Sequence, residues 1–223
     1  MKEINTVIFD LDGTLLDTLE DLSDSVNFAL ESHALPQREK SEIRLFLGNG
    51  IRNLVEKSVP QGTPECVFEE VFKTFKSYYM LHCLDKTKPY EGIAELLCDL
   101  KRKGYKMAIV SNKVHSAVQE LRNRFFADTI NVAIGESAGI RRKPSPDSVL
   151  EAIKLLGSNK KSTIYVGDSE VDFQTAQNAC LPCISVLWGF RDKEFLEHCG
   201  ANIYADSPKD ILDWLEQKNY QPT

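Results

Sequence analysis

Two aspartates stand two residues apart directly after a short apolar run near the start of the chain. Asp10 and Asp12 follow Val7-Ile8-Phe9, whose β-branched and aromatic residues predict a buried strand. In extended backbone, alternate residues point to the same side, so the two carboxylates converge. A cation or the protonation of one group would relieve their repulsion. The pair therefore indicates a metal site or an acid–base pair.

A second acidic cluster follows another predicted strand much later in the chain. Asp168 and Asp172 come after Thr163-Ile164-Tyr165-Val166. Parallel strands end at the same sheet edge, so we expect both clusters to share one pocket. Alone, each cluster is explained as readily by structure as by function: loop solvation for Asp10 and Asp12, and capping of a helix N-terminus for Asp168 and Asp172. Together they require a positive counterpart, and Mg²⁺, which prefers hard oxygen ligands, is the expected one.

Two further strand ends carry groups that bind anions. Ser111, Asn112 and Lys113 follow the apolar run 107–110 and offer a hydroxyl, an amide and an ammonium. The basic run Arg141-Arg142-Lys143 precedes Pro144. A residue before proline is biased toward extended backbone, from which a long side chain can reach inward. We therefore interpret Lys143 as a functional residue and the two arginines as part of a solvated loop.

The elements that must position these residues follow a parallel α/β pattern. Apolar runs at 107–110, 132–134, 163–166 and 184–187 are separated by helix-like sequence. Ser145-Pro146 and Ser207-Pro208 each place a capping hydroxyl before a proline suited to a first helical turn. The prediction is an α/β fold: a Rossmann-like parallel sheet core with helices on both faces.

The strand pattern stops between about Asp17 and Lys86, where amphipathic helical patterns replace it. A helical insert after the first strand of such a sheet resembles a cap over its carboxyl edge, where these folds bind ligands. We expect a core domain over residues 1–16 and 87–223 and an all-helical cap over residues 17–86. Gly48-Asn49-Gly50 predicts a turn inside that cap.

Composition narrows the classes of protein further. The chain has 223 residues, 42% of them hydrophobic, and a net charge of −6, which is typical of a globular protein and disfavours a nucleic-acid partner. No apolar run approaches the ~20 residues of a membrane span. Six cysteines are too sparse for a disulfide scaffold. We expect a cytoplasmic protein, a monomer or homodimer, with no membrane and no nucleic acid as partner.

The ordered motifs resemble those of the haloacid dehalogenase (HAD) superfamily over essentially the whole chain. The segments that carry the resemblance are Asp10-Leu11-Asp12-Gly13-Thr14-Leu15, Ser111-Asn112, Lys143-Pro144 and Gly167-Asp168-Ser169-Glu170-Val171-Asp172. The helical insert resembles a C1-type cap. The Gly48-Asn49-Gly50 turn and Lys143-Pro144-Ser145-Pro146 resemble the phosphoglycolate phosphatase group.

This resemblance implies a role for each motif residue. Asp10 would attack phosphorus and form an aspartyl-phosphate, while Asp12 would protonate the leaving oxygen and then activate water. Mg²⁺ would be bound by Asp10, Asp168 and the backbone carbonyl of Asp12, with Asp172 supporting the metal shell or Lys143. The residues expected to bind the phosphoryl oxygens are Gly13, Thr14, Ser111, Asn112 and Lys143.

We therefore predict a Mg²⁺-dependent phosphatase of a small phosphorylated metabolite, with 2-phosphoglycolate as first candidate. Asp12 argues against a haloalkanoic dehalogenase, which lacks this acid, and Gly13-Thr14 favours a phosphatase over a β-phosphoglucomutase. Mutase, pyrophosphatase and nucleotidase activities stay open as alternatives, as does a non-catalytic regulator that binds a phosphometabolite. Asn49 and Arg52 are candidate cap residues for a substrate carboxylate.

Overall fold

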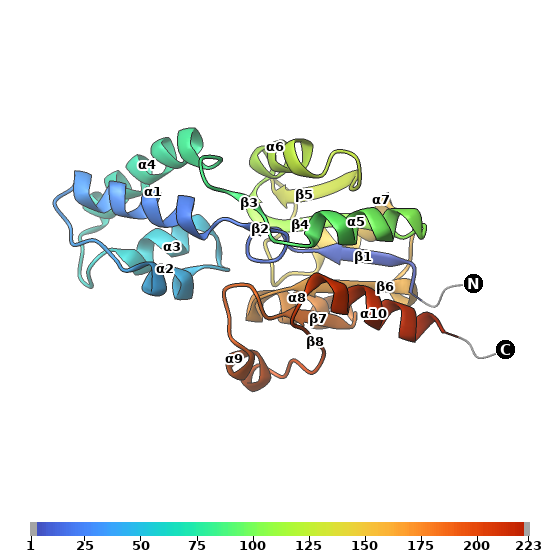
Figure 1. Cartoon of the computed structure of the whole chain (residues 1–223). Helices are drawn as coiled ribbons and strands as arrows, with labels where there is room; N and C mark the ends of the chain where they lie inside the picture. Colours follow the sequence, from blue (N-terminus) through green and yellow to red (C-terminus); the bar gives the residue numbers. More distant parts are fainter. Residues whose placement is uncertain (1–3, 221–223) are drawn as a thin grey trace. The chain divides into compact units, whose positions relative to one another are not determined.

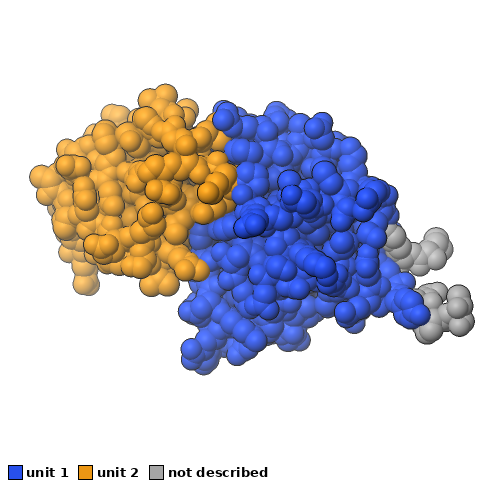
Figure 2. Space-filling model, in the orientation of Figure 1, with its two compact units in different colours: residues 1–15, 89–223 blue, residues 16–88 orange. Residues whose placement is uncertain are grey.

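The computed structural model describes residues 4–220, which divide into two compact units (Figures 1 and 2). The first unit runs to Leu15 and resumes at Pro89, and the second is Leu16–Lys88. From the sequence we expected a core of residues 1–16 and 87–223 and a cap of residues 17–86. In the structure, the first segment of the core unit ends at residue 15 instead of 16, and its second segment begins at residue 89 instead of 87. The expected core ends at 1–3 and 221–223 lie outside the described residues.

The first unit is built on one parallel sheet, as predicted. Its strands are β1 (Thr6–Phe9), β4 (Lys106–Val114), β5 (Val132–Glu136), β6 (Thr163–Gly167), β7 (Cys183–Val186) and β8 (Tyr204–Ala205). They lie in the order β5-β4-β1-β6-β7-β8, and neighbouring strands are parallel. The chain adds strands on one side of β1 and then on the other, so the end of β1 is the switch point where such sheets bind ligands.

Helices cover both faces of this sheet. Ile8, Ala108 and Tyr165 are buried on one face together with residues of α7 (Asp147–Leu155) and α8 (Glu170–Ala179). Figure 1 shows α5 (Ile93–Arg102) and α10 (Pro208–Asn219) on the opposite face. The remaining helices of this unit are α6 (His115–Phe125), η1 (Lys160–Ser162) and α9 (Lys193–His198). Burial on both faces explains why the strands read as continuous apolar runs.

The second unit is mainly helical. Its helices are α1 (Leu19–Ser32), α2 (Lys40–Phe46), α3 (Gly50–Ser58) and α4 (Glu65–His82). Two short strands, β2 (Leu16–Asp17) and β3 (Lys88–Pro89), pair where the chain enters and leaves the unit. The sequence analysis missed this ribbon because two residues per strand show no periodicity. No helix in the described part of the chain combines the length and apolarity that a bilayer crossing requires.

The two predicted serine–proline helix starts have different outcomes. Ser207 caps α10 in a capping box with Asp210, and Pro208 is in the first turn, as predicted. The prediction for α7 was wrong by one residue, because Pro146 is the cap and the helix begins at Asp147. The hydroxyl of Ser145 donates instead to the side-chain Oδ1 of Asp147, at 2.8 Å.

Candidate active site

The site lies at the switch point, where the ends of β1 and β6 meet. Asp10 directly follows β1, and its backbone N–H donates to the carbonyl of Val166 in β6, at 2.9 Å. Asp168 directly follows β6. Parallel pairing therefore brings together two carboxylates that lie far apart in the sequence, as the motif positions predicted.

A buried lysine ammonium links two of the carboxylates. Lys143 Nζ lies 2.6 Å from Asp10 Oδ1 and 2.7 Å from Asp172 Oδ1. It also donates to the hydroxyl of Tyr165, at 3.2 Å. Burial alone would lower the pKa of Lys143, but the charges of both aspartates outweigh burial and hold that pKa above its ordinary value. Lys143 is therefore a permanent cation inside the site.

Asn112 holds the backbone from which Lys143 projects. Its Oδ1 accepts the Lys143 N–H at 2.8 Å, and its Nδ2 donates to the Lys143 carbonyl at 3.2 Å. This double contact fixes the peptide on both sides of the lysine Cα. Binding of a phosphoryl oxygen by Asn112, which the sequence analysis expected, stays a prediction.

Asp168 is held by groups from two loops. Its Oδ1 accepts from the hydroxyl of Thr14 at 3.0 Å, and its Oδ2 accepts from the Phe190 N–H at 2.8 Å. Burial, followed by the charge of Asp172, raises the pKa of Asp168 to about 7, against the opposing effect of those two donors. Asp168 is thus fixed in place, and these two donors only partly compensate the charge of its ionised form.

Gly13 allows this close approach of the first loop to Asp168. It has φ of +88°, and a Cβ at this position would lie 2.4 Å from Asp168 Oδ2. Any side chain would therefore collide with the carboxylate and strain the backbone as well. The Thr14 N–H lies 3.4 Å from the Leu11 carbonyl within the same turn. Phosphate binding by the Gly13 and Thr14 amides stays a prediction.

Asp172 serves mainly to organise its neighbours. It is in the first turn of α8, where its Oδ2 accepts from the hydroxyl of Ser169 at 2.6 Å and from the Ser169 N–H at 3.2 Å. Its Oδ1 accepts from Lys143 and from the Tyr165 hydroxyl, the latter at 2.9 Å. Both oxygens are thus engaged, and the expected support of the metal shell or of Lys143 by Asp172 stays a prediction.

The carboxylates fit a hard divalent cation. One oxygen each from Asp10, Asp168 and Asp172 lie within 4.8 Å of one another, and all three side chains are buried. Burial and the charge of Asp172 raise the pKa of Asp10 well above its ordinary value, although Lys143 opposes this. One ammonium thus faces three buried carboxylates, and oxygen ligands of this kind suit Mg²⁺. Each Asp172 oxygen accepts two hydrogen bonds, whereas each Asp168 oxygen accepts one, so Asp10 and Asp168 are the side chains that would hold the ion.

Asp12 is contacted by two side chains from the end of β4. Lys113 Nζ lies 2.9 Å from Asp12 Oδ1, and Ser111 Oγ lies 3.5 Å from Asp12 Oδ2. From the sequence, Ser111 was predicted as a site residue, whereas Lys113 was noted only as an ammonium at an anion-binding strand end and was not linked to Asp12. The alternation of strand side chains could have revealed it, because residues 111 and 113 share one side of an extended segment.

The two predicted cap residues lie in the second unit. Asn49 precedes α3 as its N-cap, and Arg52 is in the first turn of that helix. The Arg52 guanidinium pairs with Glu69, lies 3.4 Å from Glu65 Oε1, and is 4.8 Å from the centre of the Phe68 ring. These contacts all lie within the unit. The expected roles of Asn49 and Arg52 in substrate selection stay predictions.

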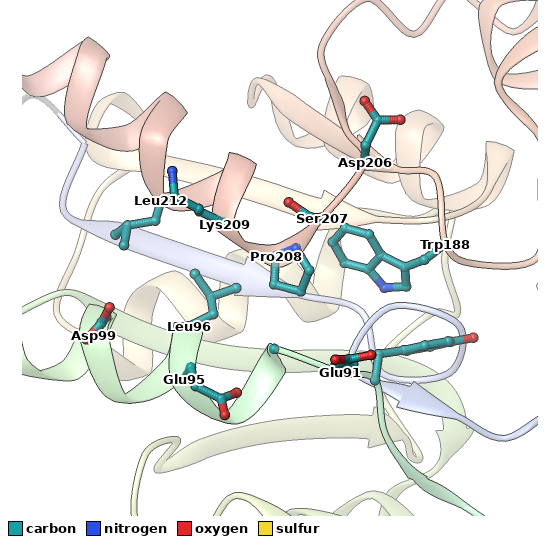
Figure 3. Close-up of a pocket in the computed structure, with 12 residues that line it drawn as sticks. Glu91, Glu95, Leu96, Asp99, Trp188, Asp206, Ser207, Pro208, Lys209 and Leu212 are labelled. Atoms are coloured by element: carbon teal, nitrogen blue, oxygen red, sulfur yellow. The ribbon is translucent and has the colours of Figure 1, made fainter.

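A separate cavity of about 630 Å³ lies between the starts of α5 and α10 (Figure 3). Its wall includes Leu96, Pro208 and Trp188, and none of the motif aspartates lines it. Trp188 also donates from Nε1 to the carbonyl of Thr14, at 3.0 Å. This tryptophan therefore supports the loop that holds Asp168, while the cavity itself is not the catalytic pocket.

Comparison with known proteins shows similarity to a family of hydrolases. A family model for haloacid dehalogenase-like hydrolases matches residues 7–186. A phosphoglycolate phosphatase of Mesorhizobium japonicum is 31% identical over 195 residues, which cover 86% of each chain. The pyrophosphatase PpaX of Bacillus cereus is 28% identical over 222 residues, 97% of this chain and 99% of that protein. The crystal structure of a candidate phosphoglycolate phosphatase from Lactobacillus delbrueckii subsp. bulgaricus superposes with a TM-score of 0.89, at 35% identity, over 99% of this chain and 100% of the other.

Proposed function

We propose that this chain, a phosphatase that belongs to the haloacid dehalogenase-like hydrolase family, is a Mg²⁺-dependent phosphomonoesterase acting through an aspartyl-phosphate on Asp10. The observation that carries the proposal is the placement of Asp10 between a buried ammonium and a second buried carboxylate. Lys143 Nζ is 2.6 Å from Asp10, and an oxygen of Asp168 lies within 4.8 Å of one of its oxygens. A carboxylate set between a cation and a metal ligand suits attack on an anionic phosphoryl group.

The first half-reaction would transfer the phosphoryl group to the protein. An Asp10 oxygen forms a bond to phosphorus while the bond from phosphorus to the ester oxygen breaks. Asp12 gives its proton to the departing oxygen, which leaves as an alcohol. Lys143 stays beside the attacking oxygen throughout and offsets the repulsion between the carboxylate and the phosphoryl oxygens.

The second half-reaction would restore the free carboxylate. Asp12, now ionised, takes a proton from water, and that water attacks phosphorus as the bond to Asp10 breaks. Inorganic phosphate leaves and Asp12 is again protonated. A bound Mg²⁺ would neutralise phosphoryl charge and orient the group toward Asp10. The residues proposed to bind the phosphoryl oxygens are Gly13, Thr14, Ser111, Asn112 and Lys143.

As substrate we propose a small phosphorylated metabolite, with 2-phosphoglycolate as the first candidate. The support is the motif resemblance together with relatives that are named phosphoglycolate phosphatases. A pyrophosphatase activity is the second candidate, because relatives of nearly full-length similarity carry that name. A phosphomutase would use the same pair of acids. A nucleotidase would use the same catalytic residues and would differ in the substrate that the cap selects.

A substrate panel tests this proposal. We expect p-nitrophenyl phosphate to be hydrolysed only with Mg²⁺, and 2-phosphoglycolate to have the highest kcat/KM among phosphoglycolate, pyrophosphate, nucleotides and sugar phosphates. Highest kcat/KM for pyrophosphate would support the second candidate instead. Phosphate exchange between sugar positions without net release would support a mutase. No turnover of any ester, with or without Mg²⁺, would contradict a phosphatase and favour a non-catalytic binding protein.

A further inference from the structure

The end of β4 contains an irregularity directly beside the site. Val110 pairs with Ile134 of β5, and the next pairing is Val114 with Glu136. Three residues of β4 thus lie opposite one residue of β5. Bulges of this kind redirect side chains and are frequent next to active sites. The bulged segment, Ser111-Asn112-Lys113, is where β4 meets the other motifs.

Lys113 is the residue of this segment that the proposed mechanism does not use. Its side chain is buried, with 6% of its surface exposed, and its Nζ lies 2.9 Å from Asp12 Oδ1. The Lys113 N–H donates to Ser111 Oγ at 3.1 Å, and that oxygen is 3.5 Å from the other Asp12 oxygen. The bulge therefore contacts both carboxylate oxygens of Asp12.

The site thus supplies a separate ammonium to each of its two catalytic acids. Lys143 lies against Asp10, and Lys113 lies against Asp12. Burying a lysine is costly unless it is paired, so this contact restrains both partners. An aspartate at a loop position otherwise samples several staggered side-chain conformations, and proton transfer requires hydrogen-bond reach to the leaving oxygen.

We infer that Lys113 is a positioning residue for Asp12: its ammonium holds the carboxyl group in the orientation from which it exchanges protons with the leaving group and with water. This inference rests on the proposed phosphatase function. Loss of the ammonium should slow the proton-dependent steps and leave substrate binding nearly unchanged. The effect should therefore depend on how much the leaving group needs a proton.

The dependence of kcat/KM on the leaving group distinguishes the positioning of Asp12 by Lys113 from a merely structural role of Lys113. The value of kcat/KM reports the steps up to the first irreversible one, here transfer to Asp10. An alkoxide needs protonation as it leaves, whereas p-nitrophenolate does not. In Lys113→Met, we expect kcat/KM for the best alkyl phosphate of the panel to fall about 100-fold, on the scale of lost general-acid catalysis. For p-nitrophenyl phosphate, kcat/KM should stay within about threefold, with a burst of p-nitrophenolate before slow turnover.

Lys106→Met is the matched control. Lys106 is in the same strand, is exposed, and its Nζ donates to the Gly157 carbonyl at 2.7 Å. Both esters should be hydrolysed by this variant as by the wild type. Lys113→Arg should recover part of the alkyl phosphate activity, because it retains a cation, and Lys113→Gln serves the same comparison if Lys113→Met does not fold.

Equal losses on both esters, or no loss on either, would overturn the role of Lys113 while the phosphatase function stands. A wild-type protein that hydrolyses neither ester would overturn both the function and this inference. A selective loss on the alkyl ester, with an unchanged thermal unfolding midpoint, is the result that supports it.

Discussion

The ammonium of Lys143 lies 2.6 Å from a carboxylate oxygen of Asp10, and both side chains are buried. In the proposed mechanism, the charge on this lysine acts most strongly when the carboxylate approaches the phosphoryl oxygens. We therefore expect Lys143→Ala to lower kcat by about two orders of magnitude or more, with a smaller change in KM. Steady-state kinetics with p-nitrophenyl phosphate measures both values.

Arg142→Ala is the control for this prediction. Arg142 is the neighbouring residue, is half-exposed, and its Nε lies 3.6 Å from Glu136 Oε2. Its removal should leave kcat within about twofold of the wild type, as is usual for an exposed ion pair. If the alanine variants at 142 and 143 show the same small loss, the catalytic role of the lysine is wrong.

Gly13 provides a steric test of the metal site. Gly13→Ala would place a Cβ 2.4 Å from Asp168 Oδ2, at a backbone φ of +88°. The carboxylate must then shift, so we expect Mg²⁺ affinity to fall about 10- to 100-fold. Titration of activity and of the unfolding temperature with Mg²⁺ measures this change.

Gly139→Ala is the control that shows the effect of backbone strain without a collision between the new Cβ and Asp168. Gly139 has the same φ of +88°, but a Cβ there meets nothing within 4 Å. This variant should lose about 1 kcal/mol of stability or somewhat more and keep the wild-type Mg²⁺ affinity. Equal Mg²⁺ affinity in the two glycine variants would show that the close approach of Gly13 to Asp168 is unimportant for the metal.

The metal should stabilise the protein more at higher pH. The pKa of Asp168 is raised from 3.8 to about 7 in the folded, metal-free protein. Between these values the folded state binds more protons than the unfolded state, so the stability of the metal-free protein falls as pH rises from about 4 to 7. Mg²⁺ compensates the carboxylate charge, so the increase in Tm caused by Mg²⁺ should be several degrees larger at pH 8 than at pH 5.

Asp168→Asn tests the origin of that pH dependence. The amide carries no charge at either pH, so most of the pH-dependent part of the Mg²⁺ effect should disappear in this variant. A wild-type protein whose Tm rises by the same amount with Mg²⁺ at both pH values would contradict the assignment of Asp168 as a metal ligand.

Much of the fold could be predicted from the sequence, because the segments with strand-like composition are also the ones that the folded sheet buries. The apolar runs before Asp10 and Asp168 are buried on both faces of the sheet, so their composition alone indicates strands. Parallel pairing then places both strand ends at one edge. The start of α7 was misplaced because the carboxylate of Asp147 contacts the Ser145 hydroxyl, a contact between side chains that propensity does not reveal.

The arrangement within the site could be predicted only in part. Motif order indicates which residues meet, but not that Asn112 brackets the backbone of Lys143. The bulge in β4 is likewise absent from any hydrophobic pattern, since it depends on the pairing with β5. Strand alternation places residues 111 and 113 on one side, but the pairing of the Lys113 ammonium with Asp12 was not predicted.

In the proposed mechanism the phosphoryl group becomes covalently bound to Asp10, and chemical trapping can detect this bond. In Asp12→Ala, p-nitrophenyl phosphate should still phosphorylate the protein, because its leaving group needs no proton, while hydrolysis of the intermediate is slow. Quenching during turnover, reduction with borohydride and peptide mass spectrometry should find the Asp10 side chain reduced to an alcohol, and Asp10→Asn should show no such product. Turnover without reduced Asp10, or reduction at a different residue, would contradict an aspartyl-phosphate on Asp10.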